Sequence, residues 1–174
     1  MISIRPGTAA DSPVLAQIEV AAGARFREVG MDAIADDEPI DVAEIARAAD
    51  DGRLWVAQDD DEVIGYALGV MAGRQPHLEQ VSTRPDRQGR GVGRLLIDHV
   101  SDWAARQGAR RLTLTTFRDV AWNAPLYEHL GFSVVPDDEL TDDLAAVRAH
   151  ERSIGLDDAG CRVVMARPIN QAVE

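Results

Sequence analysis

The sequence contains no lysine, only one cysteine and no hydrophobic run long enough to cross a membrane. A single cysteine, Cys161, excludes an intrachain disulfide, and its apolar surroundings (CRVVMA) predict a buried structural thiol. A membrane helix needs roughly 18 consecutive apolar residues. The N-terminal stretch MISIRPGTAADSP also lacks the basic-then-apolar layout of a secretory signal. We therefore expect a cytoplasmic protein that does not engage a membrane.

Basic residues are scarce, and all 18 of them are arginine, against 30 acidic residues and a net charge of −12. This balance argues against general nucleic-acid binding, because phosphate backbones need a basic face. The arginines are unevenly distributed, however. Four of them, Arg84, Arg87, Arg90 and Arg94, fall within 11 residues, with only Asp86 opposing them. Such clustering in an acidic chain predicts an anion site. A coding bias explains the missing lysine but not the clustering.

Hydrophobic patterning predicts a single domain over residues 1–174 in which strands and helices alternate. The expected strands are residues 2–5, 54–57, 63–71, 77–83, 112–117, 132–135 and 161–167. The expected helices are residues 12–22, 41–52, 91–107, 123–131 and 140–154, with a loop over residues 26–39 and a solvated acidic turn at residues 59–62. A strand, a glycine loop, a helix and a further strand imply a parallel crossover at the centre. We predict an α/β fold, a mixed sheet with helices on both faces.

The glycine loop QGRGVG, residues 88–93, opens the longest predicted helix. Alternating glycines let the backbone approach a ligand closely, and a helix N-terminus presents free N–H groups to an anion, so this loop suits phosphates. A P-loop needs lysine followed by serine or threonine, but Arg94 and Leu95 stand here. The dinucleotide fingerprint needs glycine at its sixth position, where Arg94 stands when counting from Gly89. Neither nucleotide-binding motif fits.

Residues 81–96, VSTRPDRQGRGVGRLL, closely resemble the coenzyme A-binding motif of the GCN5-related N-acetyltransferase (GNAT) superfamily. The matched pattern is Gln/Arg-x-x-Gly-x-Gly/Ala, with Gln88, Gly91 and Gly93 at its defined positions. Residues 123–132, NAPLYEHLGF, resemble the second signature of that family, an asparagine followed by a Tyr-x-x-x-Gly-Phe run. The order of elements matches over nearly the whole chain. The resemblance therefore implies the GNAT fold, with acetyl-CoA as cosubstrate.

The resemblance also implies that an amine attacks the thioester directly in a ternary complex, without an acyl-enzyme. In that family the pantetheine arm lies between the strands that correspond to residues 77–83 and 112–117. The residues assigned to the cofactor are Val81, Ser82, Thr83, Arg87, Gln88, Gly89, Arg90, Gly91, Val92, Gly93, Arg94 and Asn123. The backbone of Val81 would bond the arm, and Arg84, Arg87 or Arg90 would reach the 3′-phosphate. We expect no metal, because no two histidines share a metal-ligand spacing with a third ligand.

Two side chains are predicted to act in catalysis. Tyr127 corresponds to the family's general acid beside the thioester sulfur. Glu79 shares a strand face with His77 and Val81 because side chains alternate along a strand, and we predict it as the general base. His77 is the alternative base, or otherwise a surface histidine at the strand end. Asn123 has two open readings, a cofactor contact and a helix cap.

The resemblance also indicates which segments face the acceptor. In the family, the segment between the first two helices walls the acceptor site, here residues 22–40, and the insert at residues 140–154 can cover the same side. This segment mixes apolar residues with carboxylates, which suits a small-molecule primary amine. The alternatives are a protein or peptide N-terminal acetyltransferase and a non-catalytic acyl-CoA sensor on the same fold. A homodimer is compatible with the resemblance.

Overall fold

A computed structural model describes residues 1–169 of the chain. Its strands are β1 (Ile2–Pro6), β2 (Leu54–Asp59), β3 (Glu62–Ala72), β4 (Gln75–Thr83), β5 (Arg111–Phe117), β6 (Ser133–Val135) and β7 (Arg162–Pro168). They form a seven-stranded sheet in the order β1-β2-β3-β4-β5-β7-β6. β4 and β5 pair in parallel, with His77 opposite Thr113, whereas the β1–β2, β2–β3, β5–β7 and β6–β7 pairs are antiparallel. The predicted mixed sheet with a central parallel crossover is confirmed.

The α-helices are α1 (Ser12–Gly23), α2 (Asp32–Ala35), α3 (Val42–Asp50), α4 (Val92–Arg106), α5 (Ala124–His129), α6 (Asp142–Ser153) and α7 (Leu156–Ala159). Short 3-10 helices, η1 (Ala9–Asp11), η2 (Ala24–Val29), η3 (Pro85–Arg87) and η4 (Asp137–Glu139), join them. The chain divides into two compact units. The first comprises Met1–Val70 and Leu78–Val100, and the second comprises Met71–His77 and the chain from Ser101 onward.

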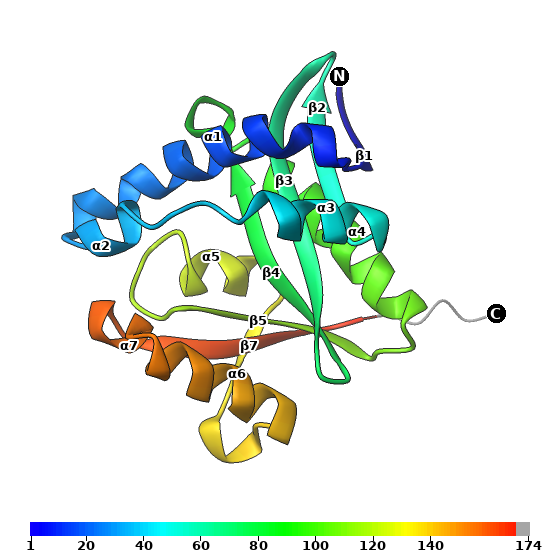
Figure 1. Ribbon diagram of the computed structural model, residues 1–174. Helices are drawn as coiled ribbons and strands as arrows, with labels where there is room; N and C mark the ends of the chain where they lie inside the picture. Colours follow the sequence, from blue (N-terminus) through cyan, green and yellow to red (C-terminus); the bar gives the residue numbers. More distant parts are fainter. Residues whose placement is uncertain (170–174) are drawn as a thin grey trace. The chain divides into compact units, whose positions relative to one another are not determined.

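The first unit has its core between two helices and the strands beneath them. α1 and α3 lie on one face of β2 and β3, and α4 runs along the opposite face (Figure 1). The core side chains alternate along the strands and recur at helical spacing along the helices, as burial of one face requires. They are Leu15, Ile45, Ala48, Leu54, Val56, Tyr66 and Leu68. This packing holds α1 and α3 over the strands.

The predicted loop over residues 26–39 is partly wrong, because η2 and α2 occupy much of it. Gly30 lies in the left-handed region with φ of 75° and ends η2. The backbone N–H of Met31 then donates to the carbonyl of Phe26 at 3.0 Å, and α2 follows directly. These turns are too short to show a helical period of apolar residues, so sequence patterning reads them as irregular.

The second unit contains β5, β7 and β6, the helices α5, α6 and α7, and the neighbouring ends of β3, β4 and α4. α6 packs on one face of β6 and β7, where Val135, Leu144, Val164 and Ala166 form a core with Leu140. The helix predicted over residues 140–154 is therefore present as α6, whereas α7 is an element that the pattern does not predict. No helix of the described residues is both long and apolar enough to cross a membrane.

The predicted burial of Cys161 is wrong. β7 begins at Arg162, so Cys161 precedes the strand, and its side chain is exposed. Its carbonyl accepts a hydrogen bond from the backbone N–H of Arg118 at 2.8 Å. The backbone is thus fixed next to the strand, but the side chain lies outside the apolar run that suggested burial.

Candidate active site

The glycine loop leads from η3 into α4 with its backbone open toward solvent. Gly89 and Gly91 have φ of 76° and 79°, values that side-chain-bearing residues rarely adopt. A Cβ added at Gly89, Gly91 or Gly93 would meet no atom within 4 Å, so the space beside the loop is empty of protein. The first backbone hydrogen bond into α4 runs from Leu95 N–H to the Gly91 carbonyl at 3.1 Å.

Among residues 1–169, no backbone acceptor is found for the N–H groups of residues 89–94. The first N–H groups of any helix lack intrahelical partners, and the helix dipole places partial positive charge at the same end. Here the preceding turn adds further N–H groups to that set. An open, glycine-lined loop with unpaired donors has the chemistry of a phosphate cradle. The residues present fit the pyrophosphate that the sequence predicts.

Two of the clustered arginines are engaged by carboxylates of the β2–β3 hairpin. Arg87 lies 3.1 Å from Asp59 and 2.7 Å from Glu62. Arg84 pairs with Glu62 and also contacts Asp86 at 3.1 Å. Residues 60–62 are exposed, as the predicted solvated turn implies, but Asp59 and Glu62 also form ion pairs that the sequence did not predict. These carboxylates neutralise Arg84 and Arg87, and the ion pairs connect the hairpin to the glycine loop.

The remaining two arginines of the cluster point outward. The side chain of Arg90 is 55% exposed and lies 3.7 Å from Asp59, and Arg94 is exposed on the first turn of α4. Because Arg84 and Arg87 already hold carboxylates, Arg90 and Arg94 are the side chains best placed to meet an added anion. The contribution of Arg87 to cofactor binding would then come through the loop geometry that its ion pairs maintain.

On β4, the alternative reading of His77 as a surface histidine is wrong. The residue is 3% exposed, and its Nδ1 lies 2.8 Å from the Thr113 Oγ1 on β5. Burial lowers the pKa of His77 to about 4, while the charge of Glu151 raises it and that of Arg162 lowers it. His77 is therefore neutral at physiological pH and already committed to a protein partner. It is a weak candidate for a base.

The other β4 residues of the predicted site differ in exposure. Glu79 is exposed, Val81 and Thr83 are half-buried, and Ser82 is buried with its Oγ accepting from Gln80 Nε2 at 2.9 Å. Val81 can offer its backbone, as the resemblance implies. Glu79 can offer a carboxylate at the surface of a strand that is otherwise largely covered. Gln88, the first residue of the loop motif, is exposed, and its Oε1 lies 3.4 Å from Arg25 Nη1.

Tyr127 lies on α5 and is half-buried, with its ring packed edge-on against Phe132 at 5.8 Å between centroids. Burial raises the pKa of Tyr127 to about 12, and the positive charge of Arg162 opposes that rise. Its hydroxyl bonds to no other group within the described part of the chain, and the hydroxyl oxygen is not among the fully buried side-chain atoms that lack a hydrogen-bond partner. The phenol is thus protonated at neutral pH and available as a donor.

Asn123 stands at the N-cap of α5, but its side chain makes no capping bond. Its Oδ1 instead accepts a hydrogen bond from Thr116 Oγ1 on β5 at 2.8 Å. Asn123 therefore caps the helix through its backbone only, because its carbonyl accepts a hydrogen bond from the Tyr127 N–H at 3.0 Å. The amide nitrogen of Asn123 is left to donate to a ligand.

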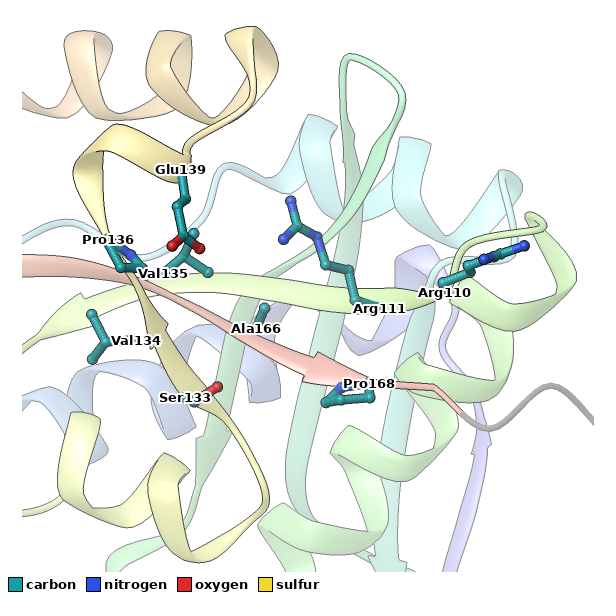
Figure 2. Close-up of a pocket in the computed structure, with 9 residues that line it drawn as sticks. All are labelled: Arg110, Arg111, Ser133, Val134, Val135, Pro136, Glu139, Ala166 and Pro168. Carbon is teal, nitrogen blue, oxygen red and sulfur yellow. The ribbon is translucent and has the colours of Figure 1, made fainter.

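The predicted residues divide between the two units. The loop, Glu79 and residues 81–83 belong to the first unit, whereas Asn123 and Tyr127 belong to the second, together with His77. A hollow of about 370 Å³ in the second unit lies at the C-terminal end of β7 and is bordered by Arg111, Glu139 and Ala166 (Figure 2). No predicted site residue borders it. Among the described residues, no three histidine, cysteine or acidic side chains gather as a metal ion would require.

The fold and the loop together define a protein of the acyl-CoA N-acyltransferase type. The model of the Acetyltransferase (GNAT) family matches residues 20–132, which is more than half of the sequence. The chain therefore belongs to the acetyltransferase (GNAT) family.

Among curated proteins, the chain is similar to the ribosomal protein bS18-alanine N-acetyltransferase of Salmonella typhimurium, with 32% identity over 42% of this chain and 50% of that protein. It is also similar to the mycothiol acetyltransferase of Beutenbergia cavernae, with 33% identity over 49% of this chain and 30% of the relative. The chain thus spans half or less of the length of these two relatives. Among solved structures, it resembles N-acetylglutamate synthase from Neisseria gonorrhoeae, complexed with coenzyme A and N-acetyl-glutamate. That likeness has a TM-score of 0.70 and 20% identity, covering 98% of this chain and 35% of the other.

Proposed function

We propose that this chain is an acetyl-CoA-dependent N-acetyltransferase that acetylates a small primary amine by direct attack in a ternary complex. We also propose that residues 1–174 form a single catalytic domain. Membership of the family supports the reaction class, and the matched residues 20–132 draw on both compact units. The curated relatives act on different acceptors by their names, so those names do not fix the acceptor of this chain.

One observation carries the proposal, the open glycine loop at the start of α4. Its N–H groups at residues 89–94 have no backbone acceptor among the described residues, and no protein atom fills the space beside its glycines. A pyrophosphate would accept from these donors at the positive end of the helix dipole. The exposed arginines Arg90 and Arg94 would add positive charge for the 3′-phosphate. Acetyl-CoA bound there would supply an activated acetyl thioester.

Tyr127 would stabilise the departing thiolate. A thiol has an ordinary pKa of about 8.5, whereas burial raises the pKa of Tyr127 to about 12. Complete proton transfer from the phenol to the thiolate is therefore uphill, by about 3 to 4 pH units on these values. A hydrogen bond from the phenol to the developing negative charge is favourable without that transfer. We assign Tyr127 as the donor to sulfur and Asn123 as a second cofactor contact.

Glu79 would accept the proton of the attacking amine. An amine attacks only when its lone pair is free, and the new amide nitrogen must lose a proton as the bond forms. Glu79 is a carboxylate on the surface of β4, close in sequence to the Val81 backbone that would bond the pantetheine arm. His77 is unsuited to this role because it is buried, neutral and bonded to Thr113.

A second candidate function is acetylation of a protein N-terminus, favoured by the similarity to the bS18-alanine N-acetyltransferase. The two functions separate in one assay of free-thiol release from acetyl-CoA against a panel of amines. The panel contains amino acids, polyamines, aminoglycosides and short peptides with free N-termini. Release with a small amine and not with peptides supports the proposal. Release with peptides alone favours the second function, and release with none despite calorimetric binding of acetyl-CoA would favour an acyl-CoA sensor.

A further inference from the structure

The second unit contains a cluster of buried charges that the proposed reaction does not use. Arg148 on α6 is 3% exposed, and its Nη1 donates to Glu151 Oε2 at 2.5 Å. Its Nη2 donates to Asp157 on α7 at 2.8 Å. Glu151, 7% exposed, also accepts from Thr115 on β5 at 2.5 Å and from Arg162 on β7 at 2.8 Å. The cluster therefore joins α6 and α7 to the ends of two strands.

Arg162 is the less compensated of the two largely buried arginines in this cluster. Arg148 has two carboxylate partners, whereas Arg162 has only Glu151 and shares it with Arg148. A charge buried with incomplete compensation is costly unless another group satisfies it. The side chain of Arg162 is 11% exposed, so little water is available for that purpose.

The guanidinium of Arg162 is anchored on one side and open on the other. Its Nε and Nη2 donate to Glu151 at 3.2 and 2.8 Å, and Nη2 also donates to Thr115 Oγ1 at 3.1 Å. Its Cζ lies 4.6 Å from the ring centroid of Phe117, which fixes the plane of the group. Nη1 bonds to none of the described residues, and it does not belong to the buried side-chain atoms that lack a partner. The remaining exposed part of the side chain thus includes Nη1.

Tyr127 and His77 lie within the electrostatic reach of this guanidinium. The charge of Arg162 lowers the pKa of both residues, against the effect of burial for Tyr127 and with it for His77. Of the acidic groups packed here, Glu151 is bound on both oxygens and Asp157 pairs with Arg148 and Arg152. The exposed Nη1 is therefore a fixed donor on the same unit as the proposed donor to sulfur.

We propose that Arg162 binds the carboxylate of the acceptor and that the acceptor is an amino acid. This inference rests on the proposed function and narrows its substrate class. An anchored guanidinium with one open nitrogen suits a carboxylate oxygen, because a charge-assisted bond completes its compensation. A phosphate dianion usually gathers several cations, and only one is presented here. Polyamines and aminoglycosides would bring further positive charge beside Arg162 and are disfavoured.

The test compares carboxylates with their amides in binding and in turnover. Calorimetry would measure binding of N-acetyl amino acids and of the matching N-acetyl amino acid amides to the CoA-loaded protein. The amino acids would span small, apolar, amidated and acidic side chains. Thiol release would be measured with the free amino acids and their α-amides. For the wild type we expect the best acid to exceed its amide by about 10- to 100-fold, as a charged hydrogen bond provides.

Two substitutions of Arg162 and one control complete the design. R162Q removes the charge. R162K keeps a cation to pair with Glu151, which protects the fold, but it leaves no second nitrogen to bind a ligand. Both should reduce the acid-to-amide ratio to about 1 and leave acetyl-CoA affinity unchanged. R152Q, which alters an exposed arginine of the same cluster, should keep the wild-type ratio.

A wild type without preference for acids would overturn the inference, as would a preference that survives in R162K and R162Q. Equal losses for acid and amide would instead assign Arg162 a purely structural role or an effect through Tyr127, and would overturn it too. If Arg162-dependent binding of the acids persists while no amine releases thiol, the carboxylate site stands and the proposed transferase function fails.

Discussion

The phenol of Tyr66 on β3 donates a 2.5 Å hydrogen bond to Oε2 of Glu19 on α1. The same oxygen accepts from the backbone N–H of Ile40 at 3.1 Å, so one carboxylate oxygen joins a strand, a helix and the segment before α3. Tyr66 is fully buried, and burial raises the pKa of Glu19. The C-terminal end of the segment at residues 22–40 is thus held against α1 by a polar contact as well as by apolar packing.

We expect Glu19→Ala to lower the free energy of unfolding by about 2 kcal/mol, because it removes the acceptor of two hydrogen bonds, one of them from a buried phenol. Glu19→Gln keeps an acceptor oxygen and should lose much less. The raised pKa of Glu19 means that the folded state holds its proton to higher pH than the unfolded state does. Its contribution to stability therefore decreases as pH rises above the ordinary value of 4.5. Urea unfolding across pH 4 to 8 should show this decrease in the wild type relative to Glu19→Gln, and parallel curves would contradict it.

For His77 we expect the opposite dependence of folding stability on pH. Its folded pKa of about 4 lies below the ordinary value of 6.5. The unfolded chain therefore takes up a proton first as pH falls, and stability is lost between pH 6.5 and 4. Relative to His77→Gln, which can still bond to Thr113, the wild type should lose about 2 to 3 kcal/mol over that range. Denaturant midpoints at pH 7 and pH 4.5 measure the difference. An equal loss in the variant would show that other groups cause the acid sensitivity.

Gly91→Asp should abolish acetyl-CoA binding, because a carboxylate would enter the space that the phosphates need. A loss of at least about 100-fold in affinity by calorimetry is expected from opposed charges at a helix N-terminus. Gly52→Asp is the matched control. Gly52 has a similar φ of 68° and equally open surroundings, but it lies after α3 rather than in the loop. Normal affinity in the Gly91 variant, or equal loss in both, would contradict the cradle.

Tyr127→Phe should lower kcat by about 10² with little change in acetyl-CoA affinity, because only the donor to the developing thiolate is removed. The raised pKa of about 12 also predicts that the phenol causes no loss of rate below about pH 10. Single-turnover thiol release from pH 7 to 10 tests both points. Unchanged turnover in the phenylalanine variant would exclude Tyr127 from the chemistry.

Glu79→Gln should lower the rate of acetyl transfer by roughly 10²-fold at pH 7, and the loss should shrink as pH rises and the free amine becomes abundant. Asp50→Asn, a change at an exposed carboxylate at the end of α3 in the same unit, should leave the rate unchanged. If both variants match the wild type at every pH, a water chain or another group takes the proton.

The positions of most strands and helices follow from local patterning, because burial of one face imposes a period of two on strands and 3.6 on helices. Residues 77–83 and 112–117 lie within β4 and β5, and the helix predicted over residues 91–107 is α4, which is one residue shorter at each end. The glycine loop is equally readable, because its requirement is a backbone conformation that glycine adopts readily. Short turns such as η2, α2 and α7 have no period to read and were not predictable in this way.

The pairing of charges could not be read from the sequence. Arg84 and Glu62 are 22 residues apart and meet because the β2–β3 hairpin lies beside the loop that follows β4. Thr115 and Arg162 are separated by 47 residues, and they approach because β5 and β7 pair antiparallel, with Phe117 opposite Arg162. The burial of His77 and the exposure of Cys161 have the same origin, since neighbouring elements decide which side chains they cover.

By itself, the sequence therefore determined the family, the order of the longer elements, the glycine loop and the tyrosine signature, all of which depend on residues close together along the chain. The tertiary structure decided which arginines are already neutralised, that His77 is unsuited to act as a base, and that Arg162 presents an open nitrogen beside Glu151. These properties depend on strand register and on the desolvation that packing imposes, and such long-range effects leave no periodic signal in the sequence.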